Sequence, residues 1–296
     1  MDSLRDIFIR VAVAASLTVA VSCGKSGGEP QAEPSSGRLP VRIATSLTRM
    51  KDDSFETGDK VGLFIVNQPG TLKAAGNHAD NACHTFDGSG WNSSSTIYWA
   101  DDETKADFYC YCPYSGTVPS VEAFPFSVRE DQSDQNAFKA SDFLWGRTAG
   151  VSPTPDPVNI TMSHRMSLLT VSLKAGDGWT DEELKSAGVT LLGLRTSALV
   201  NLSDGTVTAD GAAGEMKPLA EGGGSFKALV VPQTVESAEL VRIRVGGVSY
   251  AFKTSVNLTP GMNHTSTVTL KRTAGGVSIG ISPWETDGND YGGTVE

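Results

Sequence analysis

Apolar and polar residues alternate with a period of two through most of the chain after residue 38. In the segment 39–48 (LPVRIATSLT), Val41, Ile43 and Leu47 fall on one face, while Arg42 and other polar or small residues fall on the other. Two is the side-chain period of a β-strand, and one apolar face indicates that the strand is half-buried. The pattern therefore predicts a first strand of about ten residues over 39–48.

Further alternating segments follow, separated by glycine, proline and polar turns. A long polar loop containing His78, Cys83 and His84 is expected early in this series. The expected strands are 58–66, 97–99, 107–114, 124–128 and one long strand over 159–173, followed by several shorter ones up to residue 284. Helical signals are confined to 133–145 and to a capping box formed by Thr180 and Glu183. This pattern predicts an all-β protein made of β-sandwich domains.

The length of 296 residues predicts about two such domains. Pro153, Pro155 and Pro157 mark the expected joint, which gives domains over 38–157 and 158–296. The formal net charge of −10 leaves no basic surface that could neutralise the phosphates of a nucleic acid. No nucleic-acid partner is therefore expected.

The first 22 residues have the pattern of a secretory signal peptide. Two arginines precede the apolar run 11–22, which is too short to span a bilayer but typical of a signal sequence. The run ends at Cys23 in the order Val-Ser-Cys-Gly, which resembles a bacterial lipobox. Lipidation of Cys23 is expected; an ordinary cleaved signal with a chance cysteine is the alternative. Residues 23–37, rich in glycine, proline, serine and glutamate, are expected to be a flexible tether.

The stretch 107–114 (DFYCYCPY) raises the question of a metal or redox site. On a strand, Cys110 and Cys112 point to the same face and lie about 6.6 Å apart, too far for a disulfide between them. A zinc site needs a second ligand pair, and Cys83 alone does not supply one. The pattern favours packed thiols without chemistry. A disulfide of Cys83 with either Cys110 or Cys112 stays open, because an exported chain meets an oxidising compartment.

No group of residues has the pattern of a catalytic, cofactor or metal site. The sequence 276–280 matches G-x-S-x-G, but Pro283 blocks a following helix and no histidine follows Ser278. The segment 287–292 resembles a calcium loop only in part. His164 alternates with apolar residues and is expected to be a hydrogen-bonded core or interface histidine. We therefore expect a protein that is not an enzyme.

Motifs of a known kind occur in a fixed order in the segments 55–64 (FETGDKVGLF), 97–99 with 107–114, 141–145 (SDFLW), 160–173, 258–262 and 281–284. In their order and spacing, these segments resemble the fimbrillin-like proteins that build or anchor type V pili in Gram-negative anaerobes. The resemblance implies two transthyretin-like β-sandwich domains in tandem and a lipoprotein of the outer membrane and cell surface. It also implies a structural or adhesive role in a fimbrium. The partners would be other pilus subunits and ligands on host or bacterial surfaces.

The resemblance also implies assembly by removal of the first strand and donor-strand exchange. A trypsin-like protease is expected to cut between Arg49 and Met50, because Arg49 ends the strand and a polar turn follows. The released strand would carry Val41, Ile43 and Leu47. Its replacement would be a C-terminal donor strand from the segment 275–296, in which Val277, Ile279 and Ile281 alternate in the same way.

The alternative from another class is a monomeric glycan-binding surface lipoprotein. Its binding platform would need two or three of the five tryptophans on one exposed face.

Overall fold

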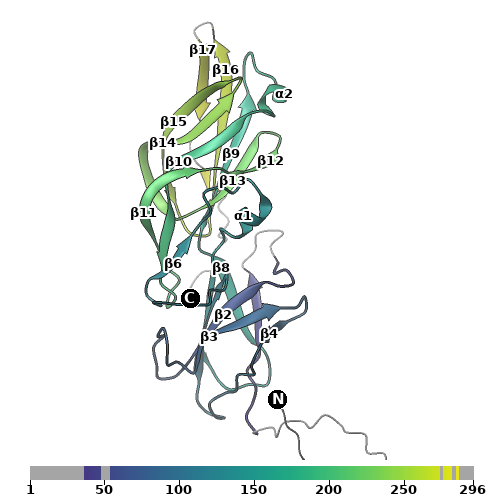
Figure 1. The fold of residues 1–296 in the computed structure, drawn as a ribbon, viewed down its shortest axis with the longest axis vertical. Coiled ribbons are helices and arrows are strands. Elements are labelled where there is room, and N and C mark those ends of the chain that lie inside the picture. Colours follow the sequence, from purple (N-terminus) through teal and green to yellow (C-terminus); the bar gives the residue numbers. More distant parts are fainter. Residues whose placement is uncertain (1–36, 48–53, 274–275, 282–284, 287–296) are drawn as a thin grey trace, which may run out of the picture. The chain divides into compact units, whose positions relative to one another are not determined.

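The structure, a computed structural model, describes residues 37–47, 54–273, 276–281 and 285–286. The chain divides into a unit of residues 1–37 and a unit of residues 38–296, and every described strand belongs to the second (Figure 1). The expected signal peptide and most of the expected tether lie outside the described residues, as do Cys23, Arg49 and Met50. No helix of the described part is long and apolar enough to cross a membrane.

The described strands form three sheets, which confirms the prediction of an all-β protein. In the first sheet β1 runs parallel to β8, and the other neighbours pair antiparallel. Its strands, in spatial order, are β1 (Ile43–Leu47), β8 (Val158–His164), β7 (Leu144–Val151), β5 (Ala106–Cys112), β2 (Lys60–Asn67), β3 (Ala79–Phe86) and β4 (Trp91–Ser93).

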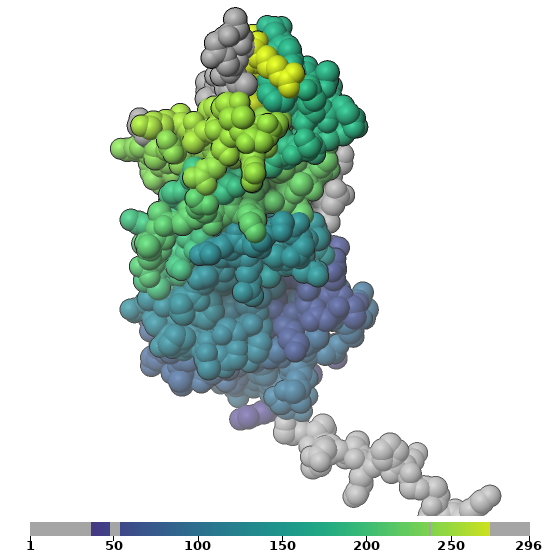
Figure 2. Space-filling view, turned by 45° about the horizontal axis from the view of Figure 1, so that its top comes forward, coloured from purple at the N-terminus to yellow at the C-terminus, as the bar shows by residue number. Residues whose placement is uncertain are grey.

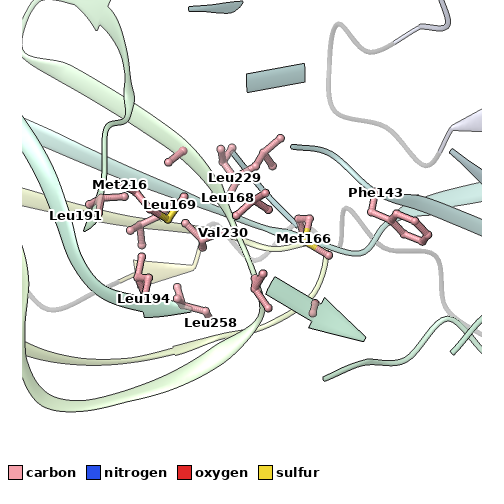
Figure 3. Close-up of a cluster of buried hydrophobic side chains, with 14 of the residues drawn as sticks. Phe143, Met166, Leu168, Leu169, Leu191, Leu194, Met216, Leu229, Val230 and Leu258 are labelled. Atoms are coloured by element: carbon pink, nitrogen blue, oxygen red, sulfur yellow. The ribbon is translucent and has the colours of Figure 1, made fainter. Parts of the chain in front are cut away.

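The other two sheets contribute side chains to one shared core, part of which is drawn in Figure 3. The second sheet has the order β11 (Val207–Met216), β10 (Gly188–Val200), β14 (Gln233–Val245) and β15 (Val248–Leu258), with β6 (Phe124–Ser127) paired to β10. The third has the order β12 (Leu219–Gly222), β13 (Ser225–Val230), β9 (Ser167–Ala175), β16 (Asn263–Thr273) and β17 (Gly276–Ile281), with β18 (Glu285–Thr286) paired to β16. Leucine, valine and isoleucine from both sheets fill the space between them, as in a β-sandwich.

Both short helices lie where the sequence predicts them. Helix α1 (Gln135–Lys139) begins at Asp134, whose carboxylate accepts hydrogen bonds from two backbone N–H groups of the first turn. Helix α2 (Asp181–Leu184) begins at Thr180, and the reciprocal bonds of a capping box with Glu183 are both present.

The larger of the two buried clusters extends from the sandwich to one face of the first sheet. Tyr109 and Tyr111 of β5 belong to it, together with Phe143. The part of the chain between β5 and β7 supplies β6 to the second sheet, and Figure 2 shows its teal-blue residues between the purple-blue and the green ones. The cores of the first sheet and the sandwich are therefore continuous on this side.

The prediction of a single long strand over 159–173 is wrong, because the chain passes from one sheet to another within this segment. β8 ends at His164 in the first sheet, and β9 begins at Ser167 in the third. Between them the Arg165 backbone N–H bonds the Phe143 carbonyl. The alternation of apolar residues continues through the break because both halves are buried, so periodicity alone gives no sign of it.

Two further expectations for the first sheet also need correction. The loop expected around Cys83 contains β3 (Ala79–Phe86), whose polar sequence ADNACHTF hides the alternation of a strand. The strand expected over 97–99 is reduced to one isolated bridge between Pro40 and Tyr98.

The domain boundary after Pro157 stays a prediction. Strand pairing groups the segment that follows Pro157 with the N-terminal strands, because β8 pairs with β1 and β7.

Position 62 of β2 requires a glycine, because the Tyr111 ring packs directly against the backbone there. A Cβ at residue 62 would lie 2.2 Å from Cε1 of Tyr111 and 2.7 Å from Oδ1 of Asn81. We expect Gly62→Ala to lower the free energy of unfolding by about 1–3 kcal/mol, because the well-packed ring must move. Urea unfolding measures this. Gly116→Ala is the matched control, since a Cβ there meets nothing within 4 Å; equal effects of the two substitutions would contradict the prediction.

Candidate functional site

Strand β1 forms one edge of the first sheet and is shorter than the expected ten residues. Residues 43–47 pair with β8, in register from Ile43 with Val158 to Leu47 with Met162. The residues before them pair elsewhere, because the Val41 N–H bonds the Ile97 carbonyl at 2.8 Å and the Trp99 N–H bonds the Leu39 carbonyl at 2.9 Å. The segment therefore lies between two neighbours, β8 and the stretch 97–99, and each pairs with a different half of it.

The expected apolar face of the segment 39–48, which contains β1, is confirmed for its described residues. Ile43 is 7% exposed and belongs to the smaller buried cluster, while Val41 and Leu47 are half-buried against it. The rest of this cluster comes mainly from β2, β5, β7 and β8. Strand β1 thus covers a core that other strands build.

The two edge strands of the first sheet meet through a side-chain contact. β1 and β4 stand first and last in the strand order, yet Nε1 of Trp91 on β4 donates a hydrogen bond to Oγ1 of Thr45 on β1 at 2.9 Å. The sheet is therefore rolled around the smaller cluster, and we call the line where β1 meets β4 and the stretch 97–99 the seam. Sequence reasoning missed this contact, because the two residues are 46 positions apart and carry no shared motif.

A cavity of about 510 Å³ lies at the end of β1 and is partly lined by Leu47, Phe55 and Leu144. Its wall also contains Asp142 and His164, and His164 Nδ1 lies 2.8 Å from Oδ2 of Asp142. His164 is 6% exposed, so the expected hydrogen-bonded core histidine is confirmed. The pairing with Asp142 was not foreseen, although both residues fall in segments that carry the family resemblance.

The cysteines of β5 pack as the strand geometry predicts. Phe108 and Cys110 belong to the smaller cluster and Cys112 packs against it, whereas Tyr109 and Tyr111 face the larger one. Burial raises the pKa of the thiols of Cys110 and Cys112 far above the usual value. Since the thiolate is the reactive form, neither is suited to redox or nucleophilic chemistry.

The two disulfides that the sequence leaves open do not form, and Cys83, Cys110 and Cys112 are free. In the strand register, Gly62 of β2 lies between Cys83 of β3 and Tyr111 of β5. Cys83 therefore faces the same side as Tyr111 and the opposite side from Cys110. With β2 between them, their strands are about 9.6 Å apart, beyond the reach of a disulfide.

The described residues contain no group of three or more His, Cys, Asp or Glu side chains that could hold a metal ion. The described tryptophans do not form an exposed platform either. Trp99 and Trp145 are 2% and 5% exposed, and Trp91 and Trp179 are half-buried on different parts of the fold.

Residues 276–281 of the expected donor segment form β17, which pairs antiparallel with β16 at the edge of the third sheet. Val277, Ile279 and Ile281 lie on this strand, and their side chains are outside the described part of the structure. Acceptor and donor candidates thus belong to different sheets.

Comparison with protein families gives a match between residues 48–284 and the model of the fimbrillin-like family. A protein named as a fimbrium subunit, Fim1C of Bacteroides uniformis, is 26% identical over 288 residues, which cover 90% of this chain and 91% of that protein.

Two solved structures described as cell adhesion proteins share the fold. One, from Bacteroides uniformis, has a TM-score of 0.69 and 21% identity and covers 88% of this chain and 100% of its own. The other, from Bacteroides ovatus, has a TM-score of 0.67 and 18% identity and covers 84% of this chain and 97% of its own.

Replacing Cys110 and Cys112 together by alanine is expected to lower the free energy of unfolding by about 1–3 kcal/mol, because packed volume is lost. Surface assembly should not change. Urea unfolding and electron microscopy of cell surfaces measure the two effects. Stoichiometric zinc in the purified wild type that is absent from the double variant would refute this prediction.

Proposed function

Because the chain belongs to the fimbrillin-like family, we propose that it is a structural or adhesive subunit of a fimbrium, or a pilus-associated surface lipoprotein, that assembles by strand exchange. The observation that carries the proposal is the place of β1. A single edge strand covers the smaller core, and it ends at Leu47, two residues before the basic residue where a protease would cut.

The burial of β1 supports an exchangeable strand. Ile43 is buried and Val41 and Leu47 are half-buried, so their removal would expose apolar surface worth about 3–6 kcal/mol. The backbone bonds to β8 and to the stretch 97–99 would be lost as well. The remaining body would have an open apolar groove with an unpaired β8 edge, which is a template for an incoming strand.

The C-terminal strand β17 suits the role of donor. It has one described neighbour, β16, so its departure leaves β12, β13, β9 and β16 paired. Its sequence alternates Val277, Ile279 and Ile281, as the apolar face of β1 does. The partners in this assembly are other pilus subunits, of the same or a related kind.

Maturation in this proposal requires a trypsin-like protease that cuts after Arg49. Arg49→Ala is expected to block polymer formation, because β1 stays covalently attached and occupies its own groove. Arg38→Ala is the control: it removes a basic residue before the strand and should not affect assembly. Low-dose trypsin, mass spectrometry of the fragments and size-exclusion chromatography test the point. A first cut elsewhere, or normal polymerisation of Arg49→Ala, would show that the mechanism is wrong.

Anchoring at the outer membrane is proposed to depend on a lipid at Cys23, from the lipobox-like order Val-Ser-Cys-Gly. Cys23→Ala should leave the precursor unprocessed or mislocalised and should abolish labelling by a radioactive fatty acid. Ser22→Ala, which keeps the cysteine, is the control. Normal outer-membrane fractionation of Cys23→Ala would count against the lipid anchor.

A further inference from the structure

The contact between Trp91 and Thr45 is the one polar contact on the otherwise apolar face of β1 among the described residues of that strand. Val41, Ile43 and Leu47 share this face, and Thr45 is the alternate position between Ile43 and Leu47 on the same face. Both residues of the pair are half-buried.

The Trp91 ring is held in place by two other aromatic rings. Phe55 packs against it edge-on, with centroids 4.9 Å apart and an interplanar angle of 80°. Phe86 lies 5.2 Å away on the neighbouring strand β3. All three rings follow residue 49 in the chain, so they would remain with the body after a cut there, while Thr45 would leave. The body would then hold an oriented N–H donor facing the empty position 45.

We propose that Trp91 is a specificity-determining residue of the seam, which selects strands that present a serine or threonine hydroxyl at the position of Thr45. The inference rests on the proposed strand exchange and names the feature by which the groove recognises its occupant.

Such selection is needed because the apolar side chains of a strand repeat every two residues, which leaves more than one register possible. A slip by one residue turns the apolar side chains outward and is excluded by the hydrophobic face alone. A slip by two residues keeps the apolar face inward, so burial discriminates weakly against it. In a two-residue slip, however, Ile43 or Leu47 would replace Thr45 opposite Trp91, and the indole N–H would lose its acceptor. Trp91 therefore fixes the register that alternation leaves open.

One consequence concerns the source of the donor strand. The alternate positions of the segment 277–281 that would face the groove are valine or isoleucine, so none of them carries a hydroxyl. A related subunit with the order apolar-x-apolar-x-Ser/Thr-x-apolar fits this groove better than the chain's own segment does.

The first test uses the uncut chain and does not depend on strand exchange. Thr45→Val and Trp91→Phe should each speed amide hydrogen exchange in β1 by about three- to tenfold, since each removes the same hydrogen bond. The double variant should exchange no faster than either single variant, because the pair is coupled. Ser46→Val is the control: its hydroxyl lies 3.3 Å from Oγ1 of Thr161, so its effect should add to that of Trp91→Phe. Additive effects of Thr45→Val and Trp91→Phe, or no effect of either, would overturn the inference.

The second test uses the full chain nicked by trypsin after residue 49 and labelled peptides of residues 38–49. The native peptide and its Thr45→Ser form should bind in the groove left by β1 with similar affinity. The Thr45→Val peptide should bind about three- to tenfold more weakly. In Trp91→Phe protein the native and Thr45→Val peptides should bind equally. Equal binding of these two peptides to the wild-type seam would overturn the inference and leave strand exchange intact. Entry of no peptide at all would overturn strand exchange, and with it the role of Trp91 in selection.

Discussion

The first sheet depends on closure by a strand that contributes little of the core it covers. Ile43 is the one fully buried side chain that β1 adds to the smaller cluster, while Leu63, Phe108, Ile160 and other residues of the neighbouring strands build the rest. On one side the closing strand pairs with β8. On the other side it is held by the hydrogen bond between Trp91 and Thr45 and by backbone hydrogen bonds to the stretch 97–99. In the proposed exchange, the loss of such a strand would have a moderate cost, because other strands build most of the core beneath it.

The larger core would not be affected by this exchange, because successive side chains of β5 face opposite sides of the sheet. Phe108 and Cys110 face the covered cluster, and Tyr109 and Tyr111 face the core that continues into the sandwich. No residue of β1 belongs to the larger cluster. Loss of β1 would therefore unpack one face of β5 and leave the other in place, so that an open groove and a folded body can coexist.

The sequence predicts what depends on local pattern and misses what depends on distant partners. The apolar face of β1, the packed cysteines of β5 and the capping box at Thr180 follow from spacings of two or three residues, and the structure confirms them. The break at Arg165 could not be predicted, because alternation continues while the chain passes between sheets. The seam contact of Thr45 with Trp91 and the pair of Asp142 with His164 depend on how the sheet curves, which no local pattern encodes.

The separation of acceptor and donor has a consequence for the form of the assembly. In the proposed exchange the groove left by β1 lies in the first sheet, whereas β17 belongs to the third. One subunit can then offer its groove to one neighbour and its donor strand to another, so each donor–acceptor contact is heterologous. Heterologous contacts give rings when the rotation closes and open filaments when it does not. The proposed acceptor groove and donor strand lie in different sheets, and this placement is compatible with a head-to-tail fibre.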